Sequence, residues 1–342
     1  MNDLRIVALD PASPTFATDI QRWHAVHLAS VTHGRADAAP WRLAEVHDMV
    51  ATPVPYRWCG AWLALRDGAV VGAALLETPF VTNLELANVF VDVVPSARGA
   101  GVGGALLQVL EDAARSRGRS IAMSEVEFGL ELPEDGAGSP DVRFAQAHGY
   151  DVALGDLQRR LALPVDPALL DRLAAEAAPH HAAYRIEVVR GTLPDAYAAG
   201  YAALASRLAV EAPAGDLLLE AEDPSVRGWR EREATYARQG LTLWHALALT
   251  AGGEVVAHST ISVSVHDTTL CHQWGTLVRA DHRGHRLGLA VKVANHRALQ
   301  ADGEPAAEIT TWNATVNDHM VAINDQLGFH KVGRTVEVQK RL

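Results

Sequence analysis

The segment Val89-Phe-Val-Asp-Val-Val-Pro-Ser-Ala-Arg98-Gly99-Ala-Gly101-Val-Gly103-Gly104 decides the fold of this chain. A β-branched run ends at a proline, an arginine and closely spaced glycines follow, and an amphipathic pattern then begins at Ala105. We expect a strand, a tight turn and a helix in that order. Backbone N–H groups without bulky side chains would then lie at the positive end of a helix, where they can bind phosphate oxygens.

The same pattern occurs a second time near the end of the chain. The stretch Leu277-Val278-Arg-Ala-Asp-His-Arg283-Gly284-His285-Arg286-Leu287-Gly288 again leads from a strand-like run into a helical pattern. Aligning Arg98 with Arg283 gives an offset of 185 residues. The copies also end alike, since a helical pattern runs into Gly149-Tyr150 in one and into Gly328-Phe329 in the other. A repeat of this length predicts two tandem copies of one fold.

Each copy has the hydrophobic pattern of an α/β (α+β) domain. The pattern predicts, in order, a strand, two helices, a hairpin with a third strand, a helix, a strand, a helix and a closing strand. Asp67-Gly68 and Gly252-Gly253 mark the hairpins. We therefore expect each copy to form a mixed, mostly antiparallel central sheet flanked by helices.

The repeat also sets the expected domain boundaries. We predict an N-terminal domain at residues 1–163, a linker helix at 164–183 and a C-terminal domain at 184–342. Each domain is expected to end in its own closing strand, at Tyr150–Leu163 and at Phe329–Val338.

Composition limits the functional classes. The 342 residues include 30 Lys plus Arg and 41 Asp plus Glu, a net charge of −11 that disfavours nucleic-acid binding and favours a neutral or cationic small substrate. Cys59 and Cys271 form neither a disulfide framework nor a zinc pattern, so we expect no metal site and a reducing compartment. Without a hydrophobic signal segment or a long apolar run, the sequence predicts a cytoplasmic protein that does not enter membranes.

The glycine turn has two other interpretations. Residues 99–104 satisfy the dinucleotide pattern G-x-G-x-x-G, and Glu125 lies at about the required distance downstream. However, a dinucleotide turn should follow the first strand of its domain, and the second copy keeps only Gly284 and Gly288. Alternatively, the glycines serve only close packing of helix on strand, which leaves the arginine in both copies unexplained.

With its context, the turn resembles a known family. Arg98-Gly-Ala-Gly101-Val-Gly103, preceded by Val-Val-Pro95 and followed by a helix, a strand and Gly149-Tyr150, resembles the acyl-CoA-binding core of the GNAT acetyltransferase superfamily. The tandem copies, the alanine-rich composition and Thr311–Asn324 resemble actinobacterial tandem GNAT proteins, of which mycothiol synthase is an example. The resemblance covers nearly the whole chain. It implies acetyl-CoA as cofactor and acyl transfer to an amine.

The resemblance also assigns cofactor-binding positions. The amides of the turn would hold the pyrophosphate of acetyl-CoA, and the end of the long strand would separate from its neighbour to bind the pantetheine. The positions implied are Val93, Val94, Arg98, Gly99, Ala100, Gly101, Val102 and Gly103 in the first copy, and Leu277, Val278, Arg283, Gly284, His285, Arg286, Leu287, Gly288, Asn313 and Asn317 in the second.

Catalytic positions separate the copies. Where some family members carry a general-base Glu or a His, the first copy has Ala87 and the second has His272. A neutral imidazole, with an ordinary pKa of about 6.5, is suited to accept a proton from an ammonium group. Alternatively, His272 is a hydrogen-bonded histidine of the strand that takes no part in catalysis.

Strand periodicity adds two expectations about faces. Glu85 and Ala87 are two residues apart, so a strand over Leu84–Val94 would place both side chains on the same face. The first copy therefore also has a possible catalytic carboxylate. By the same rule His272, Trp274 and Thr276 would share one face of the second long strand.

The last helix of each copy completes the comparison. A family tyrosine, four residues before the late glycine, protonates the CoA sulfur, but Ala145 and Asn324 stand at that position here. The thiolate would then meet Asn324, another group or solvent. Because His272 and Asn317 have no counterpart in the first copy, we expect the second copy to be the catalyst and the first to bind acyl-CoA or act as a scaffold.

The predicted function is an acetyl-CoA-dependent N-acetyltransferase that acetylates the primary amine of a small molecule by direct transfer. Acidic residues in the helical region Leu193–Gln239 would suit a cationic acceptor, although such a run is commonly a solvated face: Glu211, Asp216, Glu220, Glu222 and Asp223. Two alternatives remain, mycothiol synthase activity itself and a non-catalytic acyl-CoA-binding or sensing protein.

Overall fold

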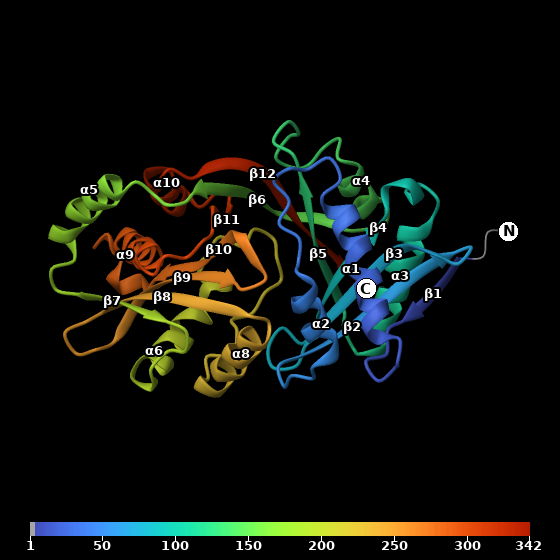
Figure 1. The fold of residues 1–342 in the computed structure, drawn as a ribbon, viewed down its shortest axis with the longest axis horizontal. Coiled ribbons are helices and arrows are strands. Elements are labelled where there is room, and N and C mark those ends of the chain that lie inside the picture. Colours follow the sequence, from blue (N-terminus) through green and yellow to red (C-terminus); the bar gives the residue numbers. More distant parts are fainter. Residues whose placement is uncertain (1–3) are drawn as a thin grey trace. The chain divides into compact units, whose positions relative to one another are not determined.

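The computed structural model describes residues 4–342, which form two compact units (Figure 1). The first unit contains the described residues through Gly155, together with Gly215–Leu217 and Gly333–Leu342. The second contains Asp156–Ala214 and Leu218–Val332. Both units are mixed, largely antiparallel sheets with helices, which confirms the predicted fold class.

In the first unit the strand order is β1-β2-β3-β4-β5-β12, and every pair described is antiparallel except β4 with β5. The strands are β1 (Leu4–Ala8), β2 (Arg57–Arg66), β3 (Ala69–Pro79), β4 (Leu86–Val93), β5 (Ile121–Phe128) and β12 (His330–Arg341). The helices are α1 (Phe16–Val31), α2 (Leu43–Ala51), η1 (Pro95–Ala97), α3 (Val102–Ser116) and α4 (Pro140–Ala147).

In the second unit the order is β6-β11-β10-β9-β8-β7, with β10 and β11 as the parallel pair. The strands are β6 (Asp151–Ala162), β7 (Arg185–Arg190), β8 (Leu241–Leu249), β9 (Val255–Ser264), β10 (Asp267–Val278) and β11 (Glu308–Ala314). The helices are α5 (Pro167–Ala177), η2 (Ala178–His180), α6 (Asp195–Ala205), α7 (Leu208–Glu211), α8 (Val226–Arg238), η3 (Ala280–His282), α9 (Leu287–Ala301) and α10 (Asp318–Leu327).

The predicted hairpin at Asp67-Gly68 is confirmed. Both residues have positive φ, 50° and 80°, as a two-residue hairpin turn that matches the twist of its strands requires. The alternation of the strands then divides the core. Leu75 packs with Trp23 on the α1 side of the sheet, and Leu76 packs with Leu106 on the α3 side.

The second unit is layered in the same way. Along β8, Leu243 and Leu247 contact the α6 and α8 side, whereas Ala246 and Ala248 contact the α9 side. Figure 1 shows α9 over one face of β8 and β9, with α6 and α8 over the other. Both faces of each sheet are therefore covered, which explains the continuous burial of β9.

The closing strands differ from the expectation in their partners. Residues 334–341 of β12 pair with residues 128–121 of β5, and residues 156–162 of β6 pair with residues 314–308 of β11. The last strand of each sequence copy thus completes the sheet of the unit built mainly from the other copy. The sequence repeat places these strands correctly, but it holds no information on which of two equivalent edges each strand occupies.

Within residues 4–342, no helix combines the length and the apolar character that a membrane span requires.

The partner of β12 can be tested through Val336, which is fully buried in the core of the first unit. We expect Val336→Ala to destabilise that core by about 2 kcal/mol, because it removes buried methyl groups without refilling the space. Hydrogen exchange should then accelerate at the amides of β5. Val265→Ala, at a side chain that is 69% exposed, is the control. Faster exchange in β11 with β5 unchanged would contradict the pairing.

Candidate functional site

The parallel strand pair of each unit separates along its length. β4 pairs with β5 from Leu86 opposite Ile121 to Asn88 opposite Met123. β10 pairs with β11 only from Leu270 opposite Glu308 to His272 opposite Thr310. Beyond these pairs, the carboxyl halves of β4 and β10 have backbone groups that the parallel ladder does not use. A ligand with amide groups could pair with these strand ends as an additional strand does.

A β-bulge distinguishes the second unit. On β10, Gln273 pairs with Ile261 of β9 and Thr276 pairs with Ser259, so three steps on one strand match two on the other. The equivalent strand pair of the first unit is regular, since β4 pairs with β3 without a shift from Gly72 opposite Val93 to Glu77 opposite Asn88. A bulge leaves one residue out of the ladder and redirects its backbone, which is common beside active sites.

Gly275 lies in this bulge, and its lack of a side chain is required there. A Cβ atom at Gly275 would lie 2.4 Å from Cδ2 of Leu208 in α7 and 3.7 Å from Cε1 of His258. The glycine therefore lets α7 approach the bulged backbone.

The bulge overturns one expectation about faces. Thr276 donates a hydrogen bond to Ser259, with 3.0 Å between the hydroxyl oxygens. Trp274 instead packs against Tyr236 of α8, with 5.0 Å between ring centroids. The extra residue between Gln273 and Thr276 reverses the alternation, so Thr276 does not share the face of His272 and Trp274.

His272 lies where β10 and β11 begin to separate. Its ring is half-buried and stacks on Trp312 of β11, with 6.0 Å between centroids and 14° between ring planes. The predicted base is thus held on the face that carries Trp274, at the last residue pair before the separation.

Glu85 is placed differently from the expectation. It lies in the turn before β4, not on the strand, and its side chain is exposed. Its carboxylate accepts a hydrogen bond from the Ser120 hydroxyl at 3.1 Å. The predicted strand over Leu84–Val94 therefore begins later than expected, at Leu86, and Glu85 lies outside the alternation on which the shared face with Ala87 was based.

The two glycine turns have the same backbone shape. Gly99 and Gly101 have φ of 74° and 79°, and in the second turn Gly284 and Arg286 have φ of 85° and 51°. Arg286 adopts the left-handed conformation of its glycine counterpart, which costs a non-glycine residue roughly 1 kcal/mol. In both copies the turn ends where a helix begins, so the N–H groups of the first helical turn have no acceptor within the helix.

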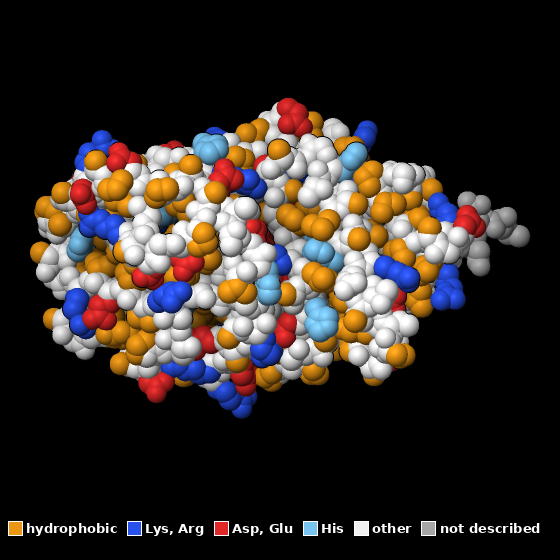
Figure 2. Space-filling model, viewed as in Figure 1, with side chains coloured by type: hydrophobic (Ala, Val, Ile, Leu, Met, Phe, Trp, Pro, Cys, Tyr) orange, Lys and Arg blue, Asp and Glu red, His pale blue; other side chains and the backbone are white. Residues whose placement is uncertain are grey.

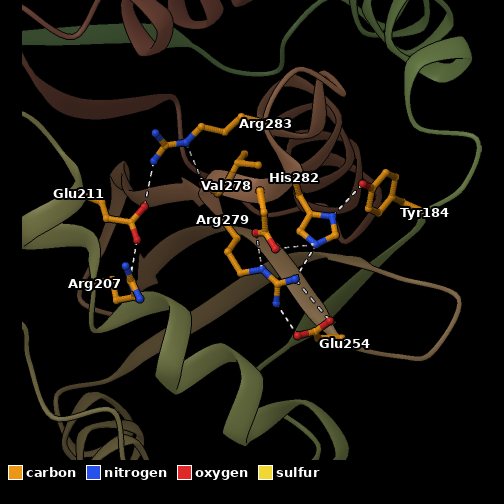
Figure 3. Close-up of polar contacts among 9 residues, drawn as sticks. Tyr184, Arg207, Glu211, Glu254, Val278, Arg279, His282 and Arg283 are labelled. Atoms are coloured by element: carbon orange, nitrogen blue, oxygen red, sulfur yellow. Dashed lines mark hydrogen bonds and ion pairs between the residues drawn. The ribbon is translucent and has the colours of Figure 1, made fainter.

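The arginine that both turns share has a structural explanation. Arg98 donates from Nε to the Val93 carbonyl at 3.3 Å and from Nη2 to the Ser30 carbonyl at 3.3 Å. Arg283 repeats this arrangement, donating to the Val278 carbonyl at 3.2 Å and to Glu211 of α7 at 2.9 Å (Figure 3). Each guanidinium ties the end of the long strand to a helix on the opposite side from α3 or α9.

Further ion pairs surround the second turn. Arg286 pairs with Glu176 of α5, and Arg279 pairs with Glu254 and Asp281. Figure 3 shows His282 between Arg279 and Tyr184, whose hydroxyl lies 2.8 Å from Nδ1. On the face drawn in Figure 2, acidic and basic side chains are likewise interspersed.

In the first unit, the α1 side of β4 is filled by the chain's own side chains. His27 Nδ1 lies 2.9 Å from a carboxylate oxygen of Asp92 on β4, and its Nε2 accepts from the Trp41 N–H at 3.1 Å. The Trp41 ring stacks on His27, with 5.3 Å between centroids, and contacts Phe90 edge-on at 4.7 Å. Arg35 of the same loop pairs with Glu127 at the end of β5.

The matching face of the second unit is polar. Tyr201 of α6 and Thr260 of β9 share a hydrogen bond of 2.9 Å, and His245 Nδ1 lies 3.1 Å from the same Thr260 hydroxyl. His258 lies beneath the bulge at Gly275. Burial lowers the pKa of His258 to about 4 and that of His245 to about 3, so both rings are neutral at pH 7.

Sequence reasoning missed this histidine cluster. A signal was present, since β9 carries polar residues at every second position from His258 to Ser264 within an apolar hairpin. Period-two polarity normally marks a solvated strand face, whereas here α6 and α8 cover it.

The predicted residues of the last helix fall into two places. Asn317 caps α10, and its side-chain oxygen accepts from the Met320 N–H at 3.3 Å. Asn324 is fully buried and donates from Nδ2 to Oδ1 of Asn313 at 2.5 Å. Its own Oδ1 accepts a hydrogen bond of 2.7 Å from Lys292 Nζ. The structure thus joins Asn313 and Asn324 and adds a lysine that the sequence analysis did not select.

Comparison with known proteins supports the fold. Residues 30–129 match the acetyltransferase (GNAT) family. The chain is similar to a tandem GNAT protein from the clavulanic acid biosynthesis pathway, with 24% identity, a TM-score of 0.79, and coverage of 99% of this chain and 98% of that one. The sequence has no significant match among curated proteins.

Two further solved structures have the same architecture at lower identity. A GCN5-related N-acetyltransferase from Sphaerobacter thermophilus is 16% identical, with a TM-score of 0.64 and coverage of 99% and 95%. A putative acetyltransferase from Pyrococcus horikoshii is 12% identical, with a TM-score of 0.56 and coverage of 99% and 89%. These matches extend over the whole chain, which confirms the predicted tandem GNAT architecture.

The buried histidines predict an acid-sensitive second unit. Because folding lowers the pKa of His258 from about 6.5 to about 4, the unfolded state binds more protons between these values, and stability falls as the pH falls through that window. We expect His258→Leu to reduce this dependence by up to about 1.4 kcal/mol per pH unit. Urea unfolding at pH 7, 6 and 5 measures it. His319→Leu, at an exposed histidine, should leave the slope unchanged. An unaltered slope in the His258 variant would rule out this contribution.

Proposed function

We propose that this chain, which has the tandem GNAT fold, is an acetyl-CoA-dependent N-acetyltransferase acting on the primary amine of a small molecule. The observation that carries the proposal is the β-bulge of β10 beside the separation of β10 from β11. It combines strand-end backbone groups that lie outside the parallel ladder with a half-buried histidine at the last residue pair of that ladder. We assign the direct transfer to the second unit.

The residues at both turns fit the cofactor. Backbone around Gly99, Gly101 and Gly284 is open, since a Cβ atom at any of them would meet nothing within 4 Å. The first N–H groups of α3 and α9 lie next to these glycines, and a helix N-terminus favours phosphate. The amides of residues 99–103 and 284–288 would hold the pyrophosphate. When bound, acetyl-CoA supplies the thioester whose acyl group is transferred.

The positions of the side chains around the strand separation suggest a role for each in the reaction. The acceptor amine must be neutral to attack, and His272 is the group assigned to take its proton, directly or through water. Backbone N–H groups at Trp274 and Gly275 would orient the acyl carbonyl, because preorganised donors stabilise the charge that develops on its oxygen. The neutral His258 and the Tyr201 hydroxyl would line the acceptor side.

The first unit is assigned acyl-CoA binding without catalysis, or a scaffold role. Ala87 stands where the second unit has His272, and Trp41 packs over the face on which an acceptor would lie. No bulge interrupts the described pairing of β3 with β4. An acceptor there would have to displace the stacked Trp41 and His27.

A non-catalytic acyl-CoA sensor is the second candidate. The observation that favours it is the set of ion pairs at the second turn, since Glu211 and Glu176 already neutralise Arg283 and Arg286. Saturable acetyl-CoA binding by calorimetry, without thiol release over a panel of amines, would support the sensor.

Gly288 and Gly103 form a matched pair that tests which turn serves catalysis. A Cβ atom at Gly288 would lie 3.1 Å from Ile323, and one at Gly103 would lie 3.2 Å from Phe144, so both sites accept a side chain with similar small shifts. We expect Gly288→Glu to reduce kcat/KM at least 100-fold, because a carboxylate at the helix start repels phosphate. Gly103→Glu should leave thiol release within threefold. The reverse result would place catalysis in the first unit.

His272 can be tested separately from cofactor binding. We expect His272→Ala to lower kcat at least 100-fold, with acetyl-CoA affinity within threefold, because the imidazole acts on the acceptor amine. His319→Ala serves as the control for an exposed histidine in the same unit. Turnover unchanged by His272→Ala would remove this residue from the mechanism.

A further inference from the structure

Lysine is rare in this chain, and one lysine is buried. The sequence contains Lys292, Lys331 and Lys340, and its other 27 cationic residues are arginine. Lys292 lies in the second turn of α9 and is 1% exposed. A chain that uses mostly arginine for positive charge thus has one of its three compact, titratable cations in the interior of the second unit.

Lys292 belongs to a chain of three polar side chains. Its Nζ donates to Oδ1 of Asn324 at 2.7 Å, and Nδ2 of Asn324 donates to Oδ1 of Asn313 at 2.5 Å. The remaining neighbours of the ammonium group are an uncharged thioether and an aromatic ring: Met320 Sδ lies at 3.9 Å and the Phe329 ring centroid at 5.5 Å. The two bonds fix the orientation of the Asn324 carboxamide, leaving one N–H of Nδ2 beyond the bond to Asn313.

This arrangement is costly for folding. Among residues 4–342, no carboxylate forms an ion pair with Lys292, and burial lowers its pKa to about 7. The titratable group that faces it is His296 on the same helix, whose pKa burial lowers to about 3, so that ring is neutral. The neighbours from α10 and beyond, Asn324, Met320 and Phe329, are uncharged.

The first unit shows that the fold does not need this cation. The repeat offsets align Lys292 with Leu107 and Asn324 with Ala145, and both of these side chains lie in the apolar core of the first unit. The polar chain is therefore specific to the unit that carries the bulge and His272.

The polar chain also ends at the proposed site. Asn313 lies on β11 three residues beyond Thr310, the last partner of β10, in the part of β11 that has separated from β10. Lys292 lies on α9 just beyond the helix start that forms the second turn. The three residues thus connect the separated strand edge to the helix of the phosphate turn.

We infer that Lys292 is a positioning residue for the leaving group: it orients and polarises the Asn324 carboxamide, whose free N–H donates to the CoA sulfur. The inference rests on the proposed function. As the acceptor nitrogen forms its bond to the acyl carbon, the carbon–sulfur bond breaks and its electron pair passes to sulfur. The acceptor proton goes to His272 or water, and the thiolate takes a proton from solvent. The ammonium of Lys292 offsets the negative charge meanwhile.

The three lysines make a direct test possible without any substitution. Lysine labelled with ¹³C at Cε and ¹⁵N at Nζ gives one resonance for each of Lys292, Lys331 and Lys340, and their pKa values can be followed by NMR. We expect CoA to raise the pKa of Lys292, and Lys292 to lower the pKa of the bound thiol, because ammonium and thiolate stabilise each other. Desulfo-CoA, which binds through the same phosphates but has no sulfur, should raise the pKa of Lys292 less than half as much. Equal effects, or none, would overturn the inference.

Kinetics give a second readout. We expect Lys292→Met to lower kcat about 100-fold with the KM for acetyl-CoA within threefold, and the melting temperature to be equal or higher. Leu107→Met, the matched position in the first unit, should leave kcat within twofold. A Lys292→Met variant with normal kcat would overturn the positioning role. If the wild-type protein acetylates no amine, the proposed function fails, but the NMR comparison still decides whether Lys292 senses the sulfur.

Discussion

The short parallel ladder between β10 and β11 is the constraint on which the second unit depends. Three residue pairs hold the strands together, and their separation beyond His272 leaves backbone groups that must find other partners. The bulge at Trp274 and Gly275 shifts β10 against β9 at that same place. The Arg283 guanidinium then fixes the strand end by binding the Val278 carbonyl and Glu211. The strand separation, the bulge and the contacts of Arg283 together mark the candidate site.

The two units have the same fold, but different side chains fill the equivalent spaces on either side of the sheet. In the first, Trp41 stacks on His27 and contacts Phe90 of β4 edge-on, and Leu107 and Ala145 fill the α3 side with apolar atoms. In the second, the corresponding spaces hold His258 with Tyr201, and Lys292 with Asn324. Buried polar groups lower stability unless they are partnered, so their concentration in one unit points to a role other than folding.

Local patterns in the sequence predicted the strands, the Asp67-Gly68 hairpin and both turns, because each depends on neighbours in the chain. Errors arose where a single residue changed the register. Glu85 lies outside β4, and Thr276 lies on the opposite face from His272, since neither a strand end nor a bulge has a strong local signal. The buried cluster of His258 and the chain through Lys292 depend on helices that are distant in sequence.

By itself, the sequence determined the tandem architecture, the two glycine turns and the place of His272 on a strand, since repeat spacing, glycine positions and periodicity are properties of adjacent residues. Tertiary structure alone decided which sheet edge β6 and β12 occupy, because both edges offer the same unpaired backbone groups. Tertiary structure also decided that Lys292 is buried against Asn324 instead of exposed to solvent. Burial results from packing between distant segments, and it turns an ordinary surface residue type into a titratable group inside the protein.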